Sequence, residues 1–147
     1  MQLLPIDEVG RVSDFDGHLS EAALMALDMT KSFYRSIGYL KPWISYLAVT
    51  ERACVGCCSF KSAPKNGQVE IAYFTFPGHE GRGVATSMAR ELIDLARAHC
   101  DSLLITAATL PGRNASHRVL EKLGFSPVAE VDHPDDGVVL EWHLLSE

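Results

Sequence analysis

A turn that carries two glycines stands out as a candidate phosphate site. Gly81 and Gly83 flank Arg82, after an alternating run over residues 69–76 and before a helical pattern that begins at Val84. The first turn of a helix leaves backbone N–H groups without intrahelical partners and carries the positive end of the helix dipole, so it can receive a phosphate where no Cβ blocks close approach. The spacing differs from that of a Walker P-loop, and the third glycine of a dinucleotide-binding fingerprint is absent. We therefore expect a phosphate-binding turn, with a tight turn that binds nothing as the alternative.

The cysteines are a second candidate for chemistry. Cys54, Cys57 and Cys58 lie together in a predicted strand, and Cys100 stands apart. The Cys54-x-x-Cys57 spacing suits a redox or zinc site, but no second Cys or His pair at zinc-ligand spacing accompanies it. Burial as small apolar residues is the interpretation that we favour, and we expect no metal.

The strands that must position the glycine turn show as alternating or apolar runs bounded by turn residues. A tight connection through Glu51 and Arg52 indicates a hairpin, and a turn at residues 64–67 leads into the strand before the glycines, so the first four strands should be consecutive and antiparallel. The predicted strands cover residues 1–6, 43–50, 53–61, 69–76, 101–108, 125–131 and 138–145.

Three helices accompany these strands. One begins at Ser20, a predicted N-cap, and ends at Gly38, with a break suggested near Thr30. A second begins at Val84, and the third covers residues 114–123 before a terminating glycine.

Composition limits the classes of function. The chain has 147 residues, 47% of them hydrophobic and 22% charged, which suits one domain with a real core. No apolar run is long enough to span a bilayer, and the first ten residues lack the basic region of a signal peptide, so we expect a cytoplasmic protein. The net charge of −6 argues against nucleic-acid binding and is compatible with a cationic substrate, although solubility alone explains such a charge.

Two motifs resemble those of the GNAT superfamily of N-acetyltransferases. Residues 80–85 are similar to its acyl-CoA-binding motif [QR]-x-x-G-x-[GA], except that Glu80 stands where Gln or Arg is usual. Residues 114–125, NASHRVLEKLGF, resemble the motif after the next strand in the branch that acetylates ribosomal-protein N termini. The resemblance covers nearly the whole chain. It implies a single mixed α/β domain over residues 1–147, with a mostly antiparallel sheet of six to seven strands flanked by helices.

The resemblance also implies acetyl-CoA as cosubstrate and a set of contacts for it. Backbone groups of Thr75 and Phe76 would pair with the pantetheine arm where the strand splays from its neighbour, and Asn114 would contact the same arm, with N-capping as its alternative role. The pyrophosphate would rest on the N–H groups of Gly81, Arg82, Gly83, Val84, Ala85 and Thr86.

Catalytic residues follow from the same resemblance. Glu70 matches the position of a catalytic base, and partial desolvation in a central strand should raise its pKa; its alternative role is an ion-paired or solvent-facing glutamate. The tyrosine that is the general acid in many members is replaced by Leu120, so Ser116 or water would protonate the leaving thiolate. His79 and His117 are suited to acid–base chemistry, but we leave them out of the catalytic set.

The acceptor groove is less defined. Phe33, Tyr34 and Trp43 would line it or belong to the core. The turn between the last two strands, which includes Asp135 and Asp136, would give it an acidic rim or be an ordinary solvated turn. We expect a cationic small amine or a peptide N terminus as acceptor.

We therefore expect an acetyl-CoA-dependent N-acetyltransferase that acts by direct transfer in a ternary complex, since no cysteine matches a family nucleophile. The alternative is an acyl-CoA-binding regulatory module that has lost turnover, which Glu80 and Leu120 motivate. A partner-regulated protein is a third possibility. We expect neither nucleic acid nor membrane as partner, and a homodimer is an expectation at the level of the family.

Overall fold

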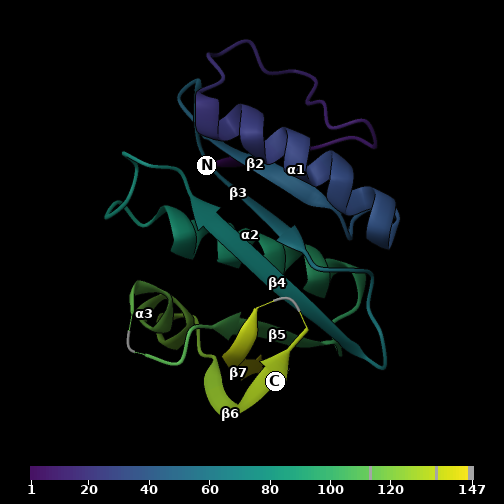
Figure 1. Cartoon of the computed structure of the whole chain (residues 1–147), viewed down its shortest axis with the longest axis vertical. Helices are drawn as coiled ribbons and strands as arrows, with labels where there is room; N and C mark the ends of the chain where they lie inside the picture. The colour runs from purple at the N-terminus through teal and green to yellow at the C-terminus, as the bar shows by residue number, and fades with distance from the viewer. Residues whose placement is uncertain (113, 135, 146–147) are drawn as a thin grey trace.

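The computed structural model describes residues 1–112, 114–134 and 136–145. Its strands form one seven-stranded sheet in the order β1-β2-β3-β4-β5-β7-β6 (Figure 1). β4 and β5 are parallel, and all other neighbouring strands are antiparallel. The predicted fold class, a mixed α/β domain with a mostly antiparallel sheet, is confirmed. The strands are β1 (Gln2–Pro5), β2 (Ser45–Thr50), β3 (Ala53–Phe60), β4 (Gln68–Thr75), β5 (Leu104–Thr109), β6 (Ser126–His133) and β7 (Gly137–Leu144), and the helices are α1 (Glu21–Ile37), α2 (Val84–His99) and α3 (Ala115–Lys122).

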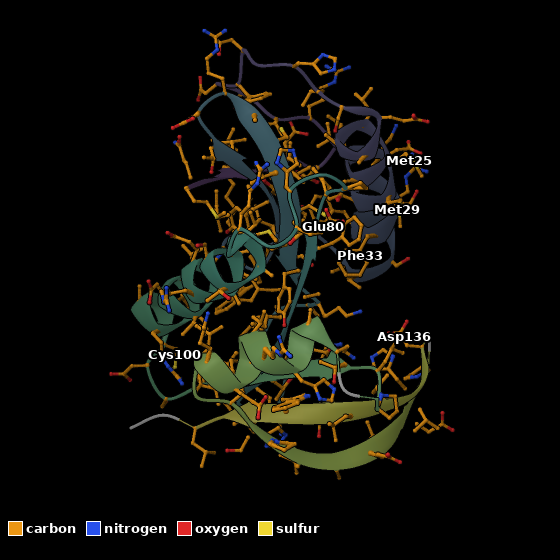
Figure 2. The ribbon with its side chains drawn as sticks, turned by 90° about the vertical axis from the view of Figure 1, so that its left-hand side faces the viewer. Met25, Met29, Phe33, Glu80, Cys100 and Asp136 are labelled. Atoms are coloured by element: carbon orange, nitrogen blue, oxygen red, sulfur yellow. The ribbon has the colours of Figure 1, made fainter. Side chains whose placement is uncertain are left out.

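The helices α1 and α2 cover opposite faces of the sheet, as the two perpendicular views show (Figures 1 and 2). α2 packs tightly against β3 because Gly56 has no side chain: a Cβ there would lie 2.9 Å from the Met88 side chain. Met88 and Leu92 of α2 are fully buried against the sheet. No helix in the described part of the chain has the length and apolarity needed to cross a membrane.

α1 is one continuous helix, which corrects the break expected near Thr30. The Thr30 hydroxyl donates a hydrogen bond to the Ala26 carbonyl oxygen at 2.7 Å, so this residue is accommodated within the helix. The predicted ends are confirmed. The Ser20 side chain accepts from the Ala23 N–H, and Gly38 follows the last turn at φ 90°.

The parallel pairing of β4 with β5 is short, and this shapes the centre of the molecule. The two strands pair through Gln68 with Leu104, Val69 with Ile105 and Glu70 with Thr106, and there the pairing ends. Beyond this point β4 continues beside β3, whereas β5 continues beside β7. The edge of β4 that faces β5 is therefore unpaired from Ile71 to Thr75.

Candidate active site

The glycine turn begins α2 in a conformation suited to an anion. Gly81 and Gly83 both have φ 76°, and Gly83 is the N-cap residue, without a side-chain hydrogen bond at the cap. A Cβ on either glycine would meet no atom within 4 Å, so open space lies over the turn. The first turn of α2 contains no acidic residue. Its free N–H groups and helix dipole can therefore receive a phosphate, and the pyrophosphate contact expected from the motif stays a prediction.

Glu80, the departure from the motif, has a structural role. Its side-chain Oε1 accepts a hydrogen bond from the Gly78 N–H at 2.8 Å. Hydrogen bonds from the backbone N–H groups of Glu80 itself and of Gly78 lower the pKa of this exposed carboxyl. The carboxylate therefore holds the loop that precedes Gly81.

The unpaired edge of β4 offers backbone groups to a ligand. The Glu70 carbonyl oxygen accepts a hydrogen bond from the Lys61 N–H, which follows the end of β3. The backbone groups of the even-numbered residues of β4 therefore point towards β3. Because successive residues alternate, Ile71, Tyr73 and Thr75 direct theirs towards the splay. The backbone groups of Thr75 thus face the splay, and their pairing with a pantetheine arm stays a prediction. Phe76 is a correction: its N–H donates to Val55 O and its carbonyl accepts from His79 N, so both groups have partners.

The two catalytic candidates from the sequence, Glu70 and Ser116, line one small cavity at the splay, with a volume of about 180 Å³. Lys61, Tyr73 and Asp136 line it too. Burial raises the pKa of Glu70, and the positive charge of Lys61 opposes part of that rise. A half-buried carboxyl with a raised pKa is suited to take a proton from an amine.

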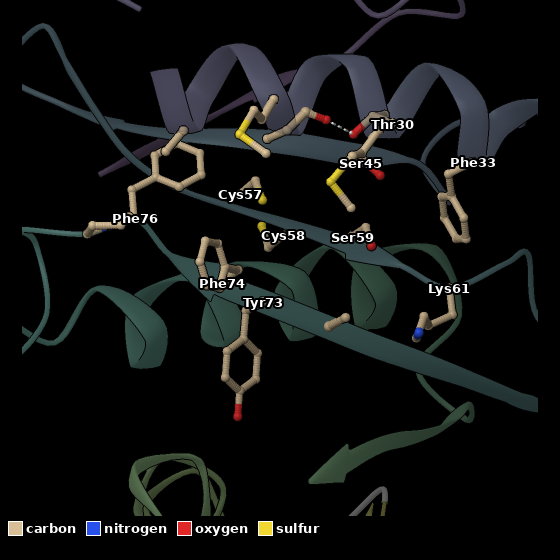
Figure 3. Close-up of a pocket in the computed structure, with 16 residues that line it drawn as sticks. Thr30, Phe33, Ser45, Cys57, Cys58, Ser59, Lys61, Tyr73, Phe74 and Phe76 are labelled. Atoms are coloured by element: carbon tan, nitrogen blue, oxygen red, sulfur yellow. Dashed lines mark hydrogen bonds between the residues drawn. The ribbon is translucent and has the colours of Figure 1, made fainter. Parts of the chain in front are cut away.

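Tyr73, which is not among the site residues predicted from the sequence, also lines this cavity. Its hydroxyl is buried and has no hydrogen-bond partner among the described residues. Burial raises its pKa, and the neighbouring Ser116 side chain offsets part of the rise, so the phenol stays protonated. Strand alternation puts Tyr73 and Glu70 on opposite faces, but the cavity lies at the strand edge and both reach it. Figure 3 shows the Tyr73 side chain extending from β4 away from α1.

Asp136, which belongs to the acidic turn, lines this cavity. Its carboxylate lies 3.5 Å from Nδ1 of His133. Asp135, the residue predicted to contact the acceptor, lies outside the described residues.

A larger groove lies between α1 and the sheet, with a volume of about 650 Å³ (Figure 3). It shares Lys61, Ala72 and Tyr73 with the small cavity, so the two spaces adjoin. Of the three aromatic residues predicted to line an acceptor groove, Phe33 lies along it.

Tyr34 and Trp43 are buried in the core instead, which corrects their predicted place. The Tyr34 hydroxyl donates to Ile6 O at 2.8 Å and accepts from Ser45 N at 2.9 Å. Burial raises its pKa to about 12. The Trp43 ring packs edge-to-face on Phe60, with ring centroids 5.0 Å apart.

The segment that begins α3 is occupied by internal contacts. Asn114 is the N-cap: its Oδ1 accepts from the N–H groups of Ser116 and His117, and its Nδ2 donates to Gly112 O at 2.9 Å. This is the alternative role, so a pantetheine contact by Asn114 stays a prediction. Leu120 is fully buried, and the His117 ring is held by Thr109 Oγ1 at 3.1 Å.

The three clustered cysteines are buried or half-buried, as interpreted from the sequence, whereas Cys100 is exposed and a hydrogen bond with the Ser102 side chain lowers its pKa. Cys54 and Cys58 are buried, Cys57 is half-buried, and none forms a disulfide. Burial raises the pKa of Cys57 to about 11. Among the described residues, no three His, Cys, Asp or Glu side chains gather so that they could hold a metal ion.

Comparison with known proteins agrees with this geometry. Residues 8–126 match the family model described as an acetyltransferase (GNAT) domain. No match was found among the curated proteins.

Solved structures share the fold at low sequence identity. One is YncA, a putative acetyltransferase from Salmonella typhimurium with its cofactor acetyl-CoA: TM-score 0.63, 22% identity, 82% of this chain and 74% of that chain covered. A spermidine N-acetyltransferase SpeG chimera from Vibrio cholerae and hSSAT has a TM-score of 0.72 at 12% identity, over 99% of this chain and 96% of that one. A ribosomal-protein-S5-alanine acetyltransferase from Vibrio fischeri has a TM-score of 0.64 at 16% identity, over 90% and 79% of the two chains.

Proposed function

Because this chain belongs to the GNAT family of acetyltransferases, we propose that it transfers an acetyl group from acetyl-CoA directly to a primary amine. The observation that carries the proposal is the joint placement of Glu70 and Tyr73, a half-buried carboxyl and a buried phenol beside Ser116, in one cavity at the splay of β4 and β5. Two proteins of the same fold support the proposal, because they are described as acetyltransferases for spermidine and for the alanine of a ribosomal protein, and both of these acceptors carry an amine.

The residues present fit acetyl-CoA, which supplies an activated acetyl thioester when bound. The open turn at Gly81 and Gly83 would hold the pyrophosphate on backbone N–H groups. The unpaired edge at Thr75 and Tyr73 would pair with the amide groups of the pantetheine arm as a further strand does. In this arrangement the cavity that Glu70 lines would receive the thioester.

Two proton transfers remain for the protein. Glu70 takes a proton from the acceptor, directly or through a water, so that the nitrogen lone pair attacks the thioester carbonyl. The new bond joins nitrogen to the acetyl carbon, and the bond from that carbon to sulfur breaks. Tyr73 donates its hydroxyl proton to the departing thiolate, the role for which Ser116 was the sequence candidate. The raised pKa of Tyr73 keeps that proton available. The nitrogen loses a second proton as it becomes an amide, and this proton restores the Tyr73 hydroxyl through water.

Two measurements test the proposal. Isothermal titration with acetyl-CoA should show binding at micromolar concentration, and a free-thiol assay with a panel of amines should show CoA release that depends on the amine. Absence of binding at high micromolar concentration would refute the proposal.

The second candidate function is an acyl-CoA-binding module without turnover, favoured by the buried Leu120 at the usual tyrosine position. Binding of acetyl-CoA without amine-dependent thiol release from any amine would support this module over the enzyme.

A further inference from the structure

The groove beneath α1 is lined almost wholly by apolar side chains. Met25, Met29 and Phe33 follow one another at intervals of four residues along α1 and face it (Figures 2 and 3). Phe74 and Phe76 line its opposite side. Met25, Met29 and Phe74 are 59%, 68% and 56% exposed. Exposed apolar side chains gathered around a hollow of this size are typical of a ligand site.

The floor of the groove changes in polarity along two paired strands. Cys57 of β3 lies opposite Phe74 of β4, and Ser59 lies opposite Ala72. Lys61 N binds Glu70 O, so the next facing pair is Lys61 with Glu70. Alternation puts the side chains of Glu70, Ala72 and Phe74 on one face. The polar end of this face is thus the catalytic cavity, and the apolar end lies about 13 Å away along the strand.

Charge distribution distinguishes the two ends. Among the described residues that line the groove, Lys61 alone is charged, and it lies at the polar end. The negative charges, Glu70 and Asp136, line the adjoining cavity. A single ammonium group would find carboxylates at the catalytic end, whereas a second one at the apolar end would be partly desolvated without a carboxylate.

We infer that the groove receives the apolar body of the acceptor, and that the preferred acceptor is a monoamine with an alkyl or aryl body rather than a polyamine. This inference rests on the proposed acetyltransferase function and adds the acceptor class. It narrows the cationic amine expected from the sequence to one that carries a single positive charge at the reacting end.

The test compares octylamine with octamethylenediamine, which have the same carbon chain and differ by one terminal amine. With acetyl-CoA saturating, kcat/KM for octylamine should exceed that for the diamine by at least about tenfold, because a second buried charge lacks a partner. Equal values, or a preference for the diamine, would overturn the inference while leaving the acetyltransferase function intact. Acetylation of no amine at all would overturn both.

A matched pair of variants locates the effect in the groove. Met29→Glu places a carboxylate in the groove, and Leu24→Glu places one on the same helix at a residue that is 53% exposed and does not line the groove. Met29→Glu should raise the KM for octylamine and leave the KM for acetyl-CoA unchanged. It should also lower the ratio of kcat/KM for octylamine to kcat/KM for the diamine by about tenfold, because the new carboxylate would pair with the second ammonium group of the diamine. Leu24→Glu should behave as the unmodified protein.

Two outcomes assign the groove to another occupant and overturn the inference. One is a stable dimer in light scattering that Met29→Glu dissociates, since the groove would then bind a second copy. The other is a higher kcat/KM for decanoyl-CoA than for acetyl-CoA, since the groove would then hold the acyl chain.

Discussion

Gly83→Val tests the phosphate turn, and the chain offers a closely matched control. Gly83 has φ 76° and Gly67, in the turn before β4, has φ 75°, and a Cβ at either would meet nothing within 4 Å. Valine should strain both turns by a similar amount, about 1–2 kcal/mol for a side chain in the left-handed region. Gly67 precedes β4 and Gly83 follows it, and the strand between the two turns is about 25 Å long at the usual rise per residue. Gly83 alone caps the helix that would bind the pyrophosphate.

The expected loss of affinity follows from the hydrogen bonds at the turn. A hydrogen bond to a charged group contributes about 1.5–3 kcal/mol, and a valine side chain over the turn should prevent at least one N–H from reaching the phosphate. At about 1.4 kcal/mol per tenfold, Kd for CoA should rise roughly tenfold to a hundredfold in Gly83→Val and stay unchanged in Gly67→Val. Isothermal titration gives Kd, and urea unfolding should show similar losses of stability in both variants.

Two results would refute this reasoning. Unchanged CoA affinity in a folded Gly83→Val protein would show that the turn does not contact the cofactor. Equal weakening in both variants would show that strain in the fold, rather than blocked contact, lowers the affinity.

Four other substitutions separate catalytic from structural residues. Glu70→Gln should lower kcat/KM by about a hundredfold or more through loss of the base. The same variant should have a higher thermal midpoint than the unmodified protein at neutral pH. Folding raises the pKa of Glu70 above 4.5, so ionisation of Glu70 destabilises the folded state as pH rises through that range. The gain in thermal midpoint should therefore vanish at lower pH, where Glu70 is protonated in both the folded and the unfolded state. An unchanged kcat/KM would contradict the assigned role. Tyr73→Phe should lower kcat about tenfold with acetyl-CoA affinity intact, measured by thiol release and titration, and Ser116→Ala should lower it less; the reverse order would return the acid role to Ser116. Tyr34→Phe leaves Ser45 N–H and Ile6 C=O without the phenol, so urea unfolding should show a loss of about 2–4 kcal/mol with the acceptor KM unchanged. A raised acceptor KM with unchanged stability would restore Tyr34 to the groove.

The sequence predicted the elements well because their signals are local. Alternation over residues 69–76 and the helical period after Val84 depend only on which side chains face the interior, and both elements formed with the expected type. Ser20 and Gly38 set the ends of α1 through contacts within four residues of themselves. Motif spacing placed the glycine turn at the start of α2 for the same reason.

The errors concern contacts between distant parts of the chain. Tyr34 was a candidate for the groove, but its partners, Ile6 and Ser45, lie far from it in sequence. Phe76, one residue past the end of β4, was expected to have free backbone groups, but its N–H donates to Val55 O. No pattern in the sequence indicates this long-range hydrogen bond. Tyr73 was missed because alternation assigns a residue to a face and says nothing of a strand edge that has lost its neighbour.

The short pairing of β4 with β5 also bears on how the fold opens. Three residue pairs join the half of the sheet that contains β1–β4 to the half that contains β5–β7. Local opening at Gln68–Glu70 would separate these halves while each keeps its own antiparallel ladder, so amide hydrogen exchange should be cooperative within each half and fastest at the junction. A molecule paired along the free edge of β4 would stabilise the pairing of β4 with β5 against local opening. Acetyl-CoA should therefore slow amide hydrogen exchange in β5 at Leu104–Thr106 as well as in β4. Binding at the edge of one strand would thus be measurable in the neighbouring strand.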